Sequence, residues 1–267
     1  MWFFKKKKKV GLVLGSGGAR GLAHIGVMKA LVENDIPIDL IVGSSAGAFF
    51  GGLYASMGKV GEIEKLARGV TNKDVVRVLA DPSWGGGLIK GEKTLKYLNN
   101  LFEGKNFDDL KIPFAAVATD MKTAESAIFR RGSVADAVRA SISIPFVYSP
   151  VERNGQFLVD GGVSSPVPVE VAKEMGADII IAVNLDGVYF LGENHKKSFF
   201  GTTIDVVKDS YFAMRYNLAK REARMADIVI EPKMKFVDDF NFANGKGAIN
   251  AGEEATIKEI KKIKKLL

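Results

Sequence analysis

The sequence predicts an α/β protein with three layers: a mostly parallel central sheet, helices on both of its faces, and a helical insertion that forms a cap. Short apolar runs rich in β-branched residues, such as 10–14 and 38–42, alternate with segments of helical periodicity. The stretch 59–110 instead holds successive helical segments, and an insertion between strands is a natural place for a cap over an active site. With 267 residues, 47% of them hydrophobic, the chain is long enough for one large domain.

The elements follow from hydrophobic periodicity and from the breakers between segments. The helix that begins at residue 22 stops before Pro37, and the helix that begins at 134 stops before Pro145. The expected strands are 10–14, 38–42, 112–119, 127–129, 156–159, 178–183 and 228–230, and the expected helices are 22–34, 46–57, 61–69, 91–102, 134–142, 169–175, 204–224 and 248–267. We expect a tail at 1–9 and a single domain over 10–267.

Composition excludes several classes of function. The chain has no cysteine, so disulfides, thiolate catalysis and Cys-based metal sites are excluded. It has two histidines, His24 and His195, and no acidic cluster with metal-site spacing, so we expect no metal and no other cofactor. Lysines 5–9 supply five of the net +7 charges, and no basic face is interleaved with aromatic residues, so we expect no nucleic-acid partner.

Two segments are candidates for contact with a membrane surface. Met1-Trp2-Phe3-Phe4 precedes five lysines, which suits an interface with anionic headgroups and does not suit a signal peptide. A solubilising tail is the alternative. Trp84 beside three glycines is either a lid or membrane-touching tip, or a plain surface loop. No run reaches the length of a transmembrane helix, so we expect a cytoplasmic protein, or one peripheral to the inner face of the membrane.

The stretch Leu40-Ile41-Val42-Gly43-Ser44-Ser45-Ala46-Gly47 joins an apolar strand directly to a helix through Gly-x-Ser-x-Gly. Glycines on both sides of a serine leave room for a sharp strand-to-helix turn, which holds the hydroxyl out at the end of a sheet. The new helix then directs N–H groups at the group that the serine attacks. Ser45 is therefore a candidate nucleophile.

A glycine-rich loop, Gly15-Ser16-Gly17-Gly18-Ala19-Arg20-Gly21, follows the first strand. Free N–H groups at the start of a helix can hold an oxyanion, and we assign that role to Gly17, Gly18 and Ala46. A dinucleotide-binding fingerprint is the competing interpretation, but Arg20 stands where it requires glycine. We expect Arg20 to brace the loop, with a phosphate contact as the alternative.

A nucleophilic serine needs a base. Asp160 follows an apolar strand and precedes Gly161 and Gly162, so it can serve as the base directly. The order Ser45, Asp160, His195 also matches a catalytic triad, although His195 lies in a polar loop. His24 follows the glycine loop on an apolar helix face, where packing or orientation of the loop is its expected role.

Four blocks resemble the patatin-like phospholipase family. They are 15–21, Gly43-Ser44-Ser45-Ala46-Gly47, Ala140-Ser141-Ile142-Ser143-Ile144-Pro145 and Asp160-Gly161-Gly162. The resemblance implies the patatin-like fold and a Ser45–Asp160 dyad without a catalytic histidine or a metal. The remaining site residues are expected to support this dyad: Gly15, Ala19, Arg20, Gly21, Gly43, Gly47, Ser141, Pro145, Gly161 and Gly162.

The resemblance also implies a reaction: hydrolysis of fatty-acyl esters in a phospholipid or lysophospholipid substrate. It makes a homodimer a reasonable expectation. Two alternatives stay open. The chain is a carboxylesterase or thioesterase for soluble acyl esters, or it is a membrane-binding protein with a vestigial site.

Overall fold

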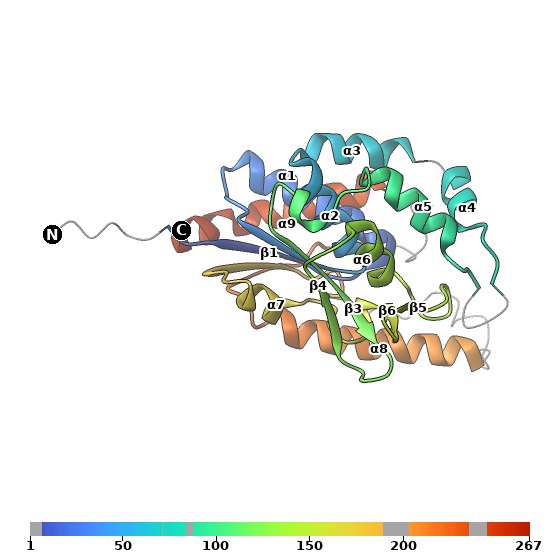
Figure 1. The fold of residues 1–267 in the computed structure, drawn as a ribbon. Coiled ribbons are helices and arrows are strands. Elements are labelled where there is room, and N and C mark those ends of the chain that lie inside the picture. Colours follow the sequence, from blue (N-terminus) through green and yellow to red (C-terminus); the bar gives the residue numbers. More distant parts are fainter. Residues whose placement is uncertain (1–6, 71, 84–87, 189–202, 235–244) are drawn as a thin grey trace.

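The computed structural model describes residues 7–70, 72–83, 88–188, 203–234 and 245–267, and these build a mixed α/β fold with a central sheet between helices (Figure 1). The strands are β1 (Val10–Leu14), β2 (Leu40–Ser44), β3 (Phe114–Asp120), β4 (Ser126–Phe129), β5 (Val151–Arg153), β6 (Gln156–Asp160), β7 (Ile179–Val183) and β8 (Ile228–Ile230). The α-helices are α1 (Ala23–Glu33), α2 (Ala46–Met57), α3 (Val60–Gly69), α4 (Asn72–Leu79), α5 (Glu92–Leu101), α6 (Val134–Ser141), α7 (Val169–Glu174), α8 (Thr203–Ala223) and α9 (Gly245–Leu266). The predicted fold class is confirmed.

The centre of the sheet is parallel. The hydrogen-bonded strands follow the path β5-β6-β3-β2-β1-β7-β8. Five of them, β3, β2, β1, β7 and β8, pair in parallel. β4, β5 and β6 add antiparallel pairings at the β3 side. The short strand β5 was not among the predicted elements, because three residues show too little alternation to indicate a strand.

Alternate residues of the central strands face two separate cores. Leu12 and Leu14 of β1 belong to the larger core, which includes residues of α1, α2 and α9. Val13 belongs to the smaller core, with Val169 of α7 and Ala219 of α8. Because side chains alternate across a strand, both faces of a fully buried strand need a helical cover. Figure 1 shows α7 and α8 below the sheet and the other labelled helices above it.

The insertion after α2 contains three helices, α3, α4 and α5. Two of them match the predicted segments 61–69 and 91–102, and α4 is an addition to them. Figure 1 shows α3 along the top of the upper layer, above α2, with α4 and α5 at one end of that layer. The predicted Trp84 tip lies outside the described residues.

One edge of β3 holds two strands end to end. Val117 pairs with Ser44, the last residue of β2, and the next residue, Ala118, pairs with Asp160, the last residue of β6. The other edge is occupied at both positions by β4, so β2 and β6 lie on the same edge. β2 runs parallel to β3 and β6 antiparallel, so their carboxyl ends meet. This arrangement brings Ser45 and Asp160 together from 115 residues apart.

Candidate active site

Ser45 occupies a strained turn between β2 and α2. Its backbone has φ 54° and ψ −119°, a conformation that a non-glycine residue adopts only when the surrounding structure imposes it. Gly43 and Gly47 make the turn possible. A Cβ atom at Gly47 would lie 1.9 Å from the carbonyl oxygen of Leu14, and one at Gly43 would lie 2.4 Å from that of Gly47. The two glycines therefore let α2 start directly against the end of β1.

Asp160 forms a hydrogen bond with the serine. Ser45 Oγ donates to Asp160 Oδ2 at 2.6 Å, and both residues are buried. The other carboxylate oxygen, Oδ1, accepts the N–H of Gly162 at 2.7 Å, while the Asp160 carbonyl accepts Thr119 Oγ1 at 2.8 Å. The carboxylate is thus fixed in one orientation, with one oxygen for the backbone and one for the serine. Gly161 and Gly162 begin the short 3₁₀ helix η3 (Gly161–Val163) that allows this turn.

The glycine-rich loop lies between β1 and the 3₁₀ helix η1 (Gly18–Leu22). Gly15 N–H donates to the Val183 carbonyl at 3.0 Å, which fixes the loop against β7. Gly18 has a positive φ of 54° and, like Ala46, lines the same cavity as Ser45. Gly17 is not among the described residues that line this cavity.

Two small residues of this loop pack inside the fold. A Cβ atom at Gly21 would lie 2.5 Å from the Cβ of Ala46, and Ala19 is buried. Their small size lets η1 lie directly against the first turn of α2. The first N–H groups of a helix have no intrahelical partner. Gly18 and Ala46 are the first residues of η1 and α2, and both line the cavity beside Ser45.

His24 supports the glycine-rich loop through a side-chain hydrogen bond. Its Nε2–H donates to the Gly15 carbonyl at 2.8 Å, and the ring is fully buried. Burial lowers the pKa of His24 from 6.5 to about 4, against a smaller opposing effect of the hydrogen bond to Gly15. The imidazole is therefore neutral at physiological pH, with its proton on Nε2.

Arg20 connects the loop to the end of β7. Its guanidinium donates to the Leu185 carbonyl at 2.9 Å and to Asp186 Oδ1 at 2.8 Å. Arg215 of α8 donates to both oxygens of Asp186, at 2.8 and 2.9 Å. Burial by itself would raise the pKa of Asp186, but the two guanidinium groups lower it below its ordinary value. Sequence reasoning did not find Asp186 or Arg215. The one signal that could have indicated Asp186 was its position shortly after the strand 179–183, which is β7 and pairs with β1.

The block 140–145 contacts Ser45 through a side chain. Ser141 Oγ accepts the N–H of Ser45 at 2.8 Å and donates to the Val117 carbonyl at 2.5 Å. Four residues later, Pro145 stands at the second position of a turn in which Val147 N–H donates to the Ile144 carbonyl at 3.1 Å. Ile144 and Val147 both line the cavity beside Ser45. Ser141 thus holds the strained turn, and Pro145 shapes the cavity wall.

A half-buried carboxylate of α8 holds the segment that follows η3. Glu222 accepts the hydroxyl of Ser165 at 2.7 Å and the N–H of Val167 at 2.8 Å. Between them, the Pro166 carbonyl accepts the N–H of Ser16 at 2.8 Å. Burial raises the pKa of Glu222 to about 7, despite these hydrogen bonds. The Glu222 carboxyl is therefore connected to the glycine loop through two hydrogen bonds, one to each side of the peptide group between Pro166 and Val167.

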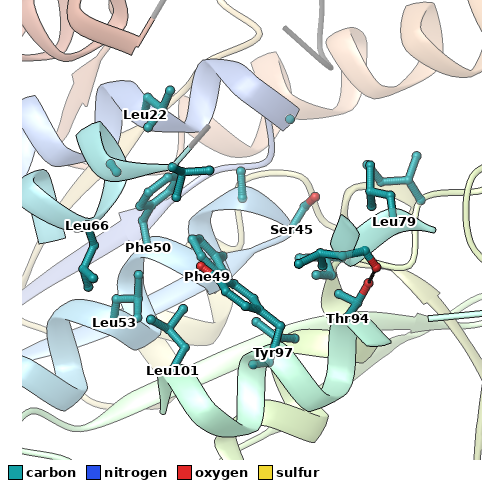
Figure 2. A pocket seen from close by; sticks show the side chains of 18 of the residues that line it. Leu22, Ser45, Phe49, Phe50, Leu53, Leu66, Leu79, Thr94, Tyr97 and Leu101 are labelled. Atoms are coloured by element: carbon teal, nitrogen blue, oxygen red, sulfur yellow. Dashed lines mark hydrogen bonds between the residues drawn. The ribbon is translucent and has the colours of Figure 1, made fainter. Parts of the chain in front are cut away.

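Ser45 opens into an apolar cavity of about 270 Å³ (Figure 2). α2 contributes Phe49, Phe50 and Leu53 on successive turns beyond the serine, and the insertion contributes the opposite wall, including Leu66, Leu79, Tyr97 and Leu101. Figure 2 shows these side chains around the space that Ser45 borders, with the Thr94 hydroxyl at one side. Aliphatic and aromatic side chains dominate the lining, as expected for an apolar ligand.

Other functional features are limited within the described residues. No group of three or more His, Asp or Glu side chains there is arranged to hold a metal ion. None of the described helices combines the length and apolar character needed to cross a membrane. His195 lies outside the described residues, as do residues 1–6 of the predicted membrane-contacting tail.

The fold and the serine–aspartate site define a class of α/β protein built around a strand-to-helix serine turn. The chain belongs to the patatin-like phospholipase family, whose sequence model matches residues 12–173. An uncharacterized NTE family protein of Mycobacterium tuberculosis is 41% identical over 179 residues, which are 67% of this chain and 49% of that protein. Human patatin-like phospholipase domain-containing protein 6 is 33% identical over 181 residues, 66% of this chain and 13% of that protein.

A solved structure confirms the fold at lower sequence similarity. The structure of VipD from Legionella pneumophila superposes with a TM-score of 0.69 at 16% identity and covers 96% of this chain and 67% of that one. This chain spans about half the length of the mycobacterial relatives, since the matched region is 49% of each. The predicted membership of the family is confirmed.

Proposed function

We propose that this protein hydrolyses fatty-acyl esters of phospholipids or lysophospholipids, with Ser45 as the nucleophile and Asp160 as the base. The observation that carries the proposal is the 2.6 Å hydrogen bond from Ser45 Oγ to Asp160 Oδ2 at the wall of an apolar cavity. A carboxylate in direct contact with a serine can accept its proton without a histidine between them.

The reaction follows from the positions of these groups. Asp160 accepts the Ser45 proton as the oxygen attacks the acyl carbonyl, and the resulting oxyanion is stabilised by the N–H groups of Gly18 and Ala46, with Gly17 as a third candidate. Asp160 then gives the proton to the leaving alcohol, which departs and leaves an acyl ester on Ser45. A water molecule that loses its proton to Asp160 attacks the acyl carbonyl, the bond to Ser45 Oγ breaks, and Asp160 returns the proton to Oγ as the fatty acid leaves.

The cavity favours a lipid over a small soluble ester. Its lining is formed mainly by Phe, Leu, Ile and Val side chains, so it can take up a fatty-acyl chain while the ester lies at Ser45. A carboxylesterase or thioesterase for soluble acyl esters remains the alternative enzyme. A membrane contact through residues 1–9, a homodimer and a cytoplasmic location also remain predictions.

Defined phospholipids and lysophospholipids test the proposal, with the released acids identified by mass spectrometry. Ser45→Ala should abolish release, and Asp160→Asn should lower kcat by roughly 10³-fold or more because the amide cannot accept the proton. His195→Ala is the matched control and should keep most of the activity. If His195→Ala is as inactive as Ser45→Ala, a triad replaces the dyad.

A fluorophosphonate probe separates the enzyme from a vestigial binding protein. It should label wild-type protein at Ser45 and leave Ser45→Ala unlabelled. Lipid binding without labelling and without released acid would show a vestigial site. A chain-length series of monomeric and aggregated esters separates the two enzymes, since a soluble esterase would favour short monomeric esters.

A further inference from the structure

Several exposed apolar side chains belong to the elements that build the walls of the cavity. Val76 of α4 is 65% exposed and Leu88 is 74% exposed. We define the mouth patch as six exposed apolar residues: Leu66, Val70, Val76, Leu88, Tyr97 and Phe146. Five of them belong to the insertion 59–110. Solvent-exposed apolar residues that cluster in this way mark an interaction site.

The mouth patch is continuous with the cavity that Ser45 borders. Leu66, Val70 and Tyr97 are exposed to solvent and also line the cavity. Val147 and Tyr148 form another part of the cavity wall, and Phe146 precedes them in the sequence. Leu88 lies beside this part, because the next residue, Ile89, pairs with Tyr148 and donates its N–H to the Val147 carbonyl at 2.9 Å. The patch therefore shares side chains with the cavity wall and borders the rest of it.

The charged residues next in sequence to members of the mouth patch are all positive. Several acidic side chains of the insertion are engaged: Glu62 with Lys59, Glu64 with Arg68, Glu92 with Lys90, and Asp81 with the N–H groups of Glu92 and Lys93. In contrast, Lys65, Arg77 and Lys96 are exposed and form no ion pair among the described residues. Each is next in sequence to a member of the patch, so cations surround apolar side chains.

We propose that the mouth patch docks on the surface of an anionic lipid layer. Apolar side chains would enter the acyl boundary while the neighbouring cations meet anionic headgroups. An acyl chain could then move from the lipid layer into the cavity without crossing water. This inference rests on the proposed lipid hydrolysis for the choice of a lipid layer as the occupant.

Co-sedimentation with vesicles of phosphatidylcholine, with and without phosphatidylglycerol, tests the docking surface. Val76→Asp and Leu88→Asp change exposed side chains that do not line the cavity, so both variants should keep the wild-type melting temperature and the rate on a soluble ester such as p-nitrophenyl butyrate. Their affinity for phosphatidylglycerol-containing vesicles should fall roughly tenfold or more, because each loses apolar contact and gains a repelled charge.

Met214→Asp is the matched control. Met214 is 71% exposed and belongs to α8, on the opposite side of the sheet from α4 and α5 (Figure 1). This variant should bind vesicles as wild type does, although it receives the same charge change.

Each other outcome has a defined meaning. Unchanged vesicle affinity of Val76→Asp and Leu88→Asp overturns the inference, as does a loss of binding caused only by removal of residues 1–9. A dimer that becomes a monomer in these two variants would show that the patch joins two copies of the chain, and would overturn it as well. Vesicle binding that responds to the variants, in a wild-type protein that hydrolyses no ester, supports the docking surface and refutes the proposed function.

Discussion

The buried imidazole of His24 makes stability depend on pH, and replacing it should remove that dependence. In the unfolded chain a histidine binds a proton with a pKa of 6.5, whereas in the folded protein burial lowers the pKa of His24 to about 4. The unfolded state therefore binds more protons between these values, so stability falls as the pH drops below 6.5. The full shift corresponds to about 3 kcal/mol, of which about 2 kcal/mol is lost already at pH 5.

His24→Gln is the suitable variant, because glutamine can still donate an N–H to the Gly15 carbonyl but does not titrate. Urea unfolding at pH 5 and pH 8 gives the free energy of unfolding of both proteins. The difference between wild type and variant should change by about 2 kcal/mol between the two pH values, in the direction of a relatively more stable variant at pH 5.

Glu222 makes this comparison of two proteins necessary. Burial raises its pKa from 4.5 to about 7, so the folded state binds the extra proton and stability falls as the pH rises through 7. This opposes the effect of His24, and the wild-type curve alone can look flat. Because Glu222 is present in both proteins, its contribution cancels in their difference. A difference that stays constant within about 0.5 kcal/mol from pH 5 to pH 8 would refute a neutral buried His24.

Two further predictions concern the serine and the cavity. Ser141→Ala leaves the N–H of Ser45 and the Val117 carbonyl without their partner, so kcat should fall roughly 10-fold to 100-fold with little change in KM, corresponding to about 1–3 kcal/mol. Steady-state kinetics measure both constants, and a rise in KM at constant kcat would contradict the role of Ser141 in holding the turn. Leu53 lies two turns of α2 beyond Ser45, about 12 Å along the helix axis, and lines the cavity. Leu53→Phe should shift the preferred ester chain to fewer carbons and Leu53→Ala to more; an unchanged profile in both variants would exclude this part of the cavity as the acyl site.

The turn at Ser45 and the glycine loop were predictable because their information is local. Gly43 and Gly47 are needed wherever a helix starts this close to a neighbouring strand, and this requirement is visible as a spacing in the sequence. Asp160 was predictable as a candidate base from its position after an apolar run. Its distance from Ser45 was not, since that distance depends on which strands share an edge of β3.

Other parts of the site leave almost no trace in the sequence. Ser141 was expected to support the site from the resemblance of its block, but its hydrogen bond to the N–H of Ser45 was not, since a serine within a short helix has many ordinary roles. The cavity residues Leu53, Leu66 and Leu98 follow helical periodicity and look like core residues. Whether a periodic apolar residue faces a core or a cavity depends on how closely the next helix packs, and periodicity carries no information about that distance.

β3 is the element that makes the candidate site possible, although the proposed nucleophile, base and oxyanion donors all lie outside it. One edge of β3 aligns β2 with β6, so the carboxyl ends that carry Ser45 and Asp160 face each other. β3 also accepts Ser141 Oγ at the Val117 carbonyl, and its Thr119 hydroxyl holds the Asp160 carbonyl. Nucleophile, base and turn support are therefore fixed to three neighbouring residues, Val117, Ala118 and Thr119. Because a strand at the centre of a sheet is among the stiffest parts of a fold, this arrangement fixes the 2.6 Å serine–aspartate contact.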